Sequence, residues 1–113
     1  MTARYFIRLP DPDALRGSGE FSFRSQGAEG FAEELQDALR NDALFARWRD
    51  AQEDPDDVDP ALGATDPEAH VRGEQHDLQI DLVATTSIPG SVFKHRLRLL
   101  AGSAWELRDV RAG

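Results

Sequence analysis

The N-terminal part of the chain alternates apolar and polar positions with a period of two, as β-strands do. Tyr5, Ile7 and Leu9 share one face of the segment at residues 4–9. A second short segment, residues 21–24, alternates Phe21 and Phe23 with polar residues. Prolines and glycines at residues 10–19 predict a loop. We therefore expect the two segments to form a hairpin.

Between residues 28 and 50 the apolar positions instead repeat with the period of an α-helix. Phe31, Leu35 and Leu39 lie on one helical face. Asn41 or Asp42 could cap a new helical segment, because short polar side chains accept hydrogen bonds from the first free amides of a helix. The pattern predicts a helix that ends near Asp50 and is either continuous or interrupted near Asn41.

Three further segments, residues 76–86, 91–100 and 103–110, alternate with a period of two and predict an antiparallel meander. Pro89-Gly90 and the Gly102 region supply the turns. Tight turns would place Leu82 opposite Leu97 and Leu99 opposite Trp105. The predicted inward residues of these strands are Leu78, Ile80, Leu82, Phe93, His95, Leu97, Leu99, Trp105 and Leu107. On the other face, an ion set of Asp81, Arg98 and Glu106 would cross three strands.

Together these elements predict a single α+β domain spanning residues 1–113. Its expected order is β-β-α-β-β-β, with an antiparallel sheet of four to five strands and the helix packed on one face.

Between the helix and the meander, at about residues 53–70, lies a connector rich in aspartate and proline. An EF-hand calcium loop would need a ligand at Val58 and a glycine at Asp59, so the calcium pattern fails. Dense like charge predicts a solvated segment. The alternative is a docking element, for which the candidate binding residues are Asp54, Asp56, Asp57 and Asp59.

The net charge of −8 at pH 7 argues against binding to a phosphate backbone, so we do not expect nucleic acid as a partner. Residues 92–113 nevertheless carry five basic and two acidic side chains. In the predicted meander these would form a basic sheet face. Its candidate binding residues are Lys94, Arg96, Arg98 and Arg108.

His95 and Asp109 are the catalytic candidates, because the predicted register places them on neighbouring strands, where a carboxylate could orient an imidazole base. A structural pair is the alternative, since no nucleophile accompanies them. His70, Glu74 and His76 contain metal-binding groups, but their spacing is too loose for a site. We therefore expect no metal and no cofactor. The chain has no cysteine, so thiolate chemistry is excluded.

The sequence thus favours a small acidic protein-interaction module, such as an adaptor, inhibitor or immunity-type partner, over an enzyme. A protein partner is expected, and self-association is a further option. The alternative is a small-ligand or enzymatic domain with a pocket between helix and sheet near His95 and Asp109. No segment resembles a secretion signal or a membrane span, and the basic residues are almost all arginine. The expected location is the cytoplasm of a bacterium.

Overall fold

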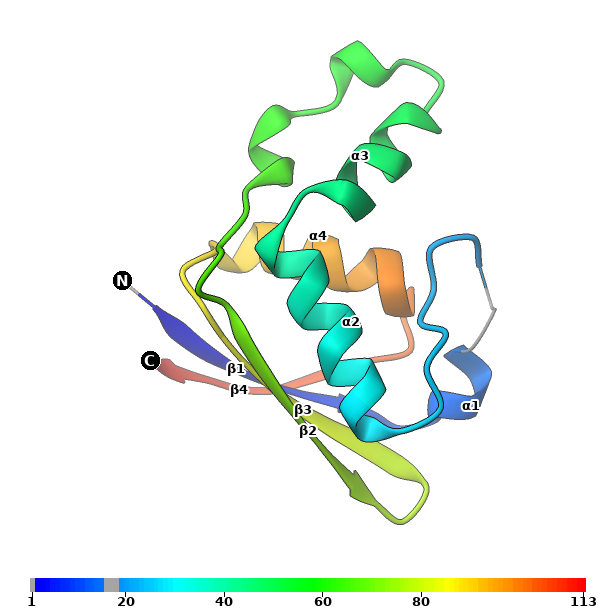
Figure 1. The fold of residues 1–113 in the computed structure, drawn as a ribbon, viewed down its shortest axis with the longest axis vertical. Helices are drawn as coiled ribbons and strands as arrows, with labels where there is room; N and C mark the ends of the chain where they lie inside the picture. The colour runs from blue at the N-terminus through cyan, green and yellow to red at the C-terminus, as the bar shows by residue number, and fades with distance from the viewer. Residues whose placement is uncertain (1, 16–18) are drawn as a thin grey trace.

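The computed structural model describes residues 2–15 and 19–113. Its sheet contains strands β1 (Ala3–Leu9), β2 (His70–His76), β3 (Gln79–Thr86) and β4 (Glu106–Ala112). All three neighbouring pairs are antiparallel, in the order β2-β3-β1-β4. The α+β class with a four-stranded antiparallel sheet is therefore confirmed (Figure 1).

Two long helices lie on one face of this sheet. Helix α2 (Ala28–Arg40) follows the single turn α1 (Pro12–Leu15) and continues, after a break, into α3 (Ala43–Asp50). Helix α4 (Gly90–Ala101) connects β3 to β4. The resulting order, β-α-β-β-α-β, is that of ferredoxin-like domains. Many unrelated activities share such a topology, so it does not decide the function.

The core lies between these helices and the covered face of the sheet. Phe31 stands edge-on to Phe23, with ring centroids 4.7 Å apart, and Tyr5 stacks on Phe93 at 4.1 Å. The predicted inward residues Ile80 and Leu82 are fully buried, and Trp105 and Leu107 pack partly buried against the core. Leu78 does not: it is 85% exposed, because the chain turns at Asp77 between β2 and β3.

Of the two alternatives that the sequence left open, the helix interrupted near Asn41 is the one observed. Helix α2 ends at Arg40 and α3 begins at Ala43. The Asn41 side chain accepts a hydrogen bond from the Ala43 amide at 3.0 Å. A short polar side chain thus satisfies one free donor at the start of α3, as expected of Asn at such a position.

Two predicted strands are wrong. Residues 21–24 form turns rather than a strand, and Phe23 is tied to helix α4 by a hydrogen bond from its amide to the Leu100 carbonyl at 3.0 Å. Residues 91–100 belong to helix α4, not to a meander. Consequently Leu82 pairs with Ile7 of β1 rather than with Leu97. Part of the predicted loop at residues 10–19, namely 16–18, lies outside the described residues.

The acidic connector is folded rather than extended. It contains the short 3-10 helices η1 (Pro55–Asp57) and η2 (Pro60–Gly63). At its far end, Asp66 is buried and accepts hydrogen bonds from the Thr86 hydroxyl at 2.8 Å and from the Ser87 and Glu68 amides. The connector is thus fixed to the end of strand β3.

Candidate interaction surface on the open face of the sheet

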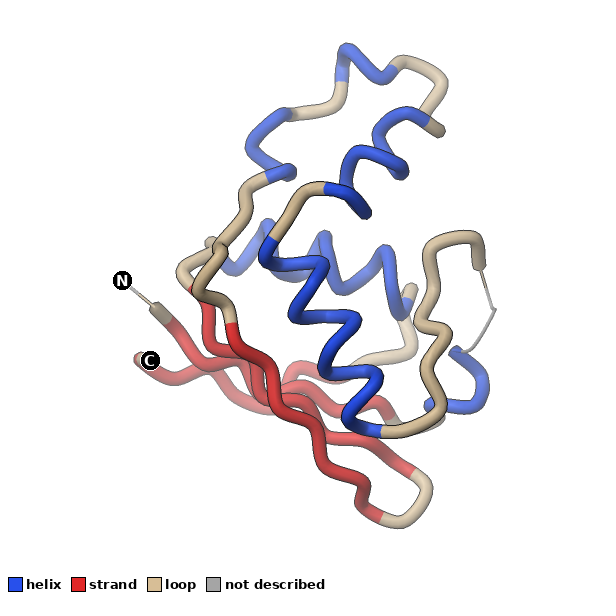
Figure 2. The backbone as a smooth tube through the Cα atoms, in the orientation of Figure 1, coloured by secondary structure: helices blue, strands red, loops and turns tan. Residues whose placement is uncertain are grey.

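The four strands have one covered and one open face. Figure 2 shows the helices gathered on one side of the sheet. In β1, Tyr5, Ile7 and Leu9 are buried on the covered side. The alternate residues Arg4, Phe6 and Arg8 lie on the other side and remain accessible. Strand β3 repeats this alternation. An antiparallel sheet can leave one face to solvent in this way, so the side chains of that face determine what it can bind.

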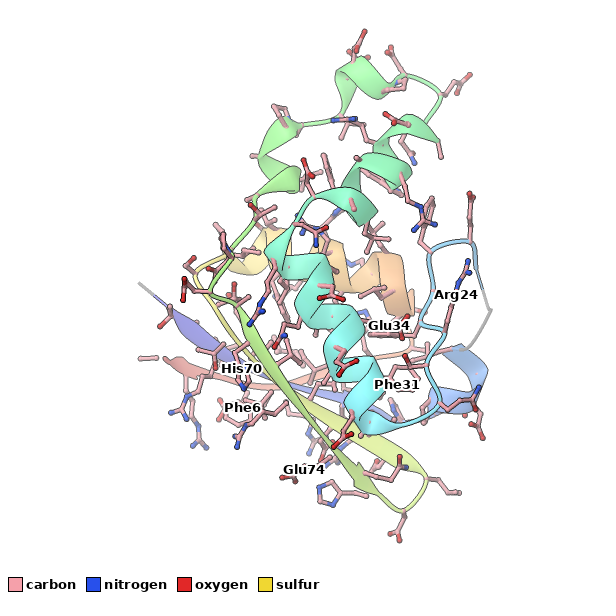
Figure 3. All side chains as sticks on the ribbon, viewed as in Figure 1. Phe6, Arg24, Phe31, Glu34, His70 and Glu74 are labelled. Atoms are coloured by element: carbon pink, nitrogen blue, oxygen red, sulfur yellow. The ribbon has the colours of Figure 1, made fainter. Side chains whose placement is uncertain are left out.

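Strand register orders the open face into three rows, each crossing all four strands. The acidic row consists of Glu74, Asp81, Arg8 and Glu106. The central row consists of Arg72, Val83, Phe6 and Asp109. The basic row consists of His70, Thr85, Arg4 and Arg111. Figure 3 labels Glu74, Phe6 and His70, one residue from each row.

The acidic row contains the closest cross-strand ion pair of the described residues. The Arg8 guanidinium donates to both carboxylate oxygens of Asp81, at 2.9 and 3.4 Å. The sequence predicted an ion set of Asp81, Arg98 and Glu106. The structure retains Asp81 and Glu106, but Arg8 of β1 stands between them, because β1 and not residues 91–100 separates β3 from β4.

Further ion pairs run along strand β4. Arg108 lies 3.2 Å from Glu106, and Arg111 lies 2.7 Å from Asp109. The hydrogen bond from Arg111 lowers the pKa of Asp109, and the amide of Val110 contributes in the same direction. Asp109 is therefore a stable anion at neutral pH and not a candidate proton carrier.

The centre of the open face is hollowed. The hollow has a volume of about 400 Å³, and its apolar side chains include Phe6 and Val83. Arg72 and Arg108 also line it. The Arg111 guanidinium lies 5.2 Å from the Phe6 ring centroid, within cation–π range. An apolar floor between guanidinium groups can hold an apolar side chain and a carboxylate together.

Two arginines of the open face are available for a partner. Arg4 in the basic row and Arg72 in the central row have no ion pair within residues 2–15 and 19–113, and both are exposed. The remaining arginines of this face already contact carboxylates, as described above. Arg4 and Arg72 are therefore the arginines that a bound carboxylate would reach without displacing an existing contact.

The residues of β2 that carry metal-binding groups lie at two different ends of the open face. His76 lies 3.3 Å from Glu74 and 3.6 Å from Asp81 at one end of the face. His70 belongs to the basic row at the other end. In the described part of the chain, no group of three or more histidine, cysteine or acidic residues is placed to hold a metal ion.

The predicted proximity of His95 and Asp109 is wrong. His95 belongs to helix α4, where its ring contacts Trp48 of α3 with centroids 4.6 Å apart. Asp109 belongs to β4 and pairs with Phe6 on the open face. Burial lowers the pKa of His95, and the nearby charges of Arg96 and Arg98 lower it further. Within the described residues, no ion pair or hydrogen bond joins His95 to a carboxylate that could orient it as a base.

The predicted basic sheet face also does not exist, because Lys94, Arg96 and Arg98 lie on helix α4. Arg96 is fully buried, and its guanidinium donates to the carbonyls of Ala38, Leu62 and Ala64. It therefore anchors the acidic connector instead of binding a partner. Among the predicted basic binding residues, only Arg108 reaches the open face.

The predicted acidic residues lie elsewhere in the molecule. Asp54, Asp56, Asp57 and Asp59 are exposed on or beside η1 and η2. Figure 1 shows these short helices at the opposite end of the molecule from the β2–β3 turn. The structure does not bring them together with the open face.

A second, larger depression of about 780 Å³ lies beside helices α2 and α3. Phe21, Leu44 and Arg47 are among its lining residues. His95 lines neither of these two depressions.

Sequence reasoning missed the central residues of the open face, Arg4, Phe6, Arg8 and Arg72. A signal was present for three of them. The alternation that placed Tyr5, Ile7 and Leu9 in the core also placed Arg4, Phe6 and Arg8 on the opposite side of the same strand. Their importance depends on β1 being a central strand, which its own residues do not indicate.

Comparison with protein-family models, with curated proteins and with solved structures finds no match to this chain. Within the described residues, no helix is both long and apolar enough to cross a membrane.

Proposed function

We propose that this protein is a protein-interaction module that binds its partner through the open face of the sheet. The observation that carries the proposal is the central hollow, where Phe6 and Val83 lie among arginines. Aromatic residues and arginine are enriched at protein interfaces, because both provide large contact areas and arginine also pairs with carboxylates.

The chemistry of the face indicates the kind of partner. An apolar side chain would enter the hollow over Phe6, and carboxylates would reach Arg4 and Arg72. We therefore infer a partner segment in which an apolar residue has acidic neighbours. The proposed setting is the cytoplasm of a bacterium.

Nucleic acid is the main alternative ligand, because an aromatic ring beside arginines on an open sheet can stack on a base. Four carboxylates stand on the same face, namely Glu74, Asp81, Glu106 and Asp109. They would repel phosphates, as would the net charge of −8. The face therefore fits a protein better than a nucleic acid.

Quantitative capture from a lysate of the source organism tests the proposal. Phe6→Ala and Arg72→Glu should each reduce the amount of a specifically retained protein at least about tenfold, the equivalent of about 1.4 kcal/mol. Leu78→Ala and Arg98→Glu are matched controls, because they change an exposed apolar residue and an exposed arginine away from the hollow.

Equal retention by all four variants would contradict the proposal. Retention of nucleic acid that is lost with Arg72→Glu and falls steeply with salt would favour the alternative. Circular dichroism of each variant shows whether its fold is intact.

A further inference from the structure

Strand β4 forms an uncovered edge of the sheet. It is the outermost strand next to β1, and six of its seven residues are exposed. Val110 is 47% exposed although its side chain is apolar. The opposite edge is better protected, because the Val71 amide of β2 donates to the Gln36 side chain at 3.1 Å. An uncovered edge can pair with another strand through its free backbone groups.

The outward backbone groups of β4 can be identified. The Gly113 amide donates to the Thr2 carbonyl, so even-numbered residues of β1 face β4. Tyr5 and Ile7 consequently face β3, and their β4 partners Val110 and Leu107 direct their own amide and carbonyl groups away from the sheet. The Val110 amide donates a hydrogen bond to the carboxylate of its neighbour Asp109, at 2.9 Å.

A β-bulge makes the two halves of this edge equivalent. The register between β1 and β4 shifts between Phe6 and Ile7, which leaves Arg108 as the extra residue. Without it, residues 107 and 110 would lie on opposite faces, because their separation is odd. With it, Leu107 and Val110 share the covered side, while Glu106 and Arg111 share the open side.

The order of side chains on this edge is self-complementary. We propose that β4 pairs antiparallel with β4 of a second copy of the chain, about a two-fold axis between Arg108 and Asp109. Glu106 of one copy then lies opposite Arg111 of the other, Leu107 opposite Val110, and Arg108 opposite Asp109. The outward backbone groups of Leu107 and Val110 face each other, which is the arrangement that a closed two-fold pair requires.

Charged residues on an edge strand commonly prevent such pairing. That protection depends on like charges meeting, and the proposed register brings opposite charges together. A shift of one residue places Arg108 opposite Arg108 or Asp109 opposite Asp109. A shift of two residues brings Glu106 opposite Asp109 or Arg108 opposite Arg111. The charges therefore select this register over its neighbours.

The resulting dimer has one continuous eight-stranded sheet. Because the two-fold axis stands perpendicular to the sheet, both open faces lie on the same side. The pairing joins the edges of two β4 strands, whereas the proposed partner site is centred on Phe6; Arg108 and Arg111 adjoin both. Variants that change neither arginine, such as Val110→Pro and Phe6→Ala, allow either proposal to fail alone. A short edge buries little area, and we expect a reversible dimer that forms as concentration rises.

Analytical ultracentrifugation over a concentration series tests the pairing. Glu106→Arg and Arg111→Glu should each weaken dimerisation at least tenfold. By symmetry, each substitution creates two pairs of like charges in the dimer, one at each end of the paired strands. An equimolar mixture of the two variants should restore the dimer, since each altered residue then meets an opposite charge. Glu74→Arg, on the other edge strand, is the matched control and should dimerise as the unaltered protein does.

Val110→Pro provides a second test that changes no charge. Proline removes an amide that points away from β1, so the fold should persist while the dimer weakens. Phe6→Ala should leave the dimer intact, which separates this inference from the proposed partner site. A monomer at all concentrations, or folded charge variants that fail to associate when mixed, would overturn the pairing.

Discussion

Arg96 shows how a single residue can have the opposite role from the one its charge suggests. Its guanidinium is buried and donates hydrogen bonds to three backbone carbonyls rather than to a carboxylate. One carbonyl belongs to α2 and two belong to the connector at and beside η2. A planar donor group can satisfy several acceptors at once, which a lysine ammonium does less well. Burial lowers the pKa of Arg96, but arginine remains charged at neutral pH.

We predict that Arg96→Met lowers the free energy of unfolding by about 3 kcal/mol, because buried carbonyls lose hydrogen bonds to a charged donor. The free energy of unfolding of Arg96→Lys should lie between those of the unaltered protein and Arg96→Met. Arg98→Met, at an exposed position of the same helix, should change the free energy of unfolding by less than about 0.5 kcal/mol. Urea denaturation measures all three. A loss below about 0.5 kcal/mol for Arg96→Met would show that the connector does not depend on this anchor.

His95 is the residue whose titration should affect stability near neutral pH. Burial lowers its pKa in the folded protein, and Arg96 and Arg98 act in the same direction. Its Nδ1 atom is buried and has no hydrogen-bond partner in the described structure. The unfolded chain therefore binds a proton at a higher pH than the folded protein does, near the ordinary pKa of about 6.5.

The contribution of His95 to the free energy of unfolding should consequently be constant above this pH and fall as the pH drops below it. We predict that His95→Phe, which cannot bind a proton and keeps an aromatic contact with Trp48, reduces this dependence between about pH 7 and 5. Denaturant titrations at several pH values provide the measurement. His70→Phe is the control, because His70 is exposed. An unchanged slope in the His95 variant would assign the pH dependence to other groups.

At the scale of elements, the acidic connector combines exposed charge with buried anchors. Asp59 caps η2 by accepting a hydrogen bond from the Ala61 amide at 2.9 Å, but it remains exposed like Asp54, Asp56 and Asp57. Asp66 is buried. Burial alone would raise its pKa, but hydrogen bonds from Ser87, Thr86 and Glu68 lower the pKa below the usual range.

We predict that changing all four exposed aspartates to asparagine lowers the free energy of unfolding by no more than about 1 kcal/mol. Exposed charges contribute little to stability, and the change relieves repulsion between like charges. The single change Asp66→Ala should cost more, about 1–3 kcal/mol, since buried donors lose their acceptor. Thermal and urea denaturation compare the two. A larger loss in the fourfold variant would show that η1 and η2 depend on their own carboxylates.

At the scale of the whole molecule, the covering helices determine where binding can occur. Both α2 and α4 lie on the same face of the sheet, so the opposite face and the β4 edge remain accessible (Figure 2). The acidic connector lies at the far end from the β2–β3 turn (Figure 1). The exposed aspartates of the connector and the open face of the sheet are thus two separate surfaces of the molecule.

The sequence by itself determined the strands predicted at residues 4–9 and 76–86, the helical segment that starts near Ala28 and the α+β class, because their periodicity allows one interpretation. It left open whether the helix is interrupted near Asn41. The pattern of residues 91–100 allowed two interpretations, a strand and a helix. Phe93 and Leu97 are four positions apart, and such residues share a face both in a strand and in a helix. Only packing decided between them: Val92, Phe93, Leu97 and Leu100 are buried together as one side of helix α4.

The site depended on that same choice. With residues 91–100 in the sheet, Arg96 would be exposed and His95 would adjoin Asp109; with them in a helix, β1 pairs with β4 and Phe6 becomes central to the open face. The local pattern identifies which residues can share a face. Which strands become neighbours depends on long-range pairing, and that pairing placed Arg72 and Phe6 in one row and left β4 at the edge.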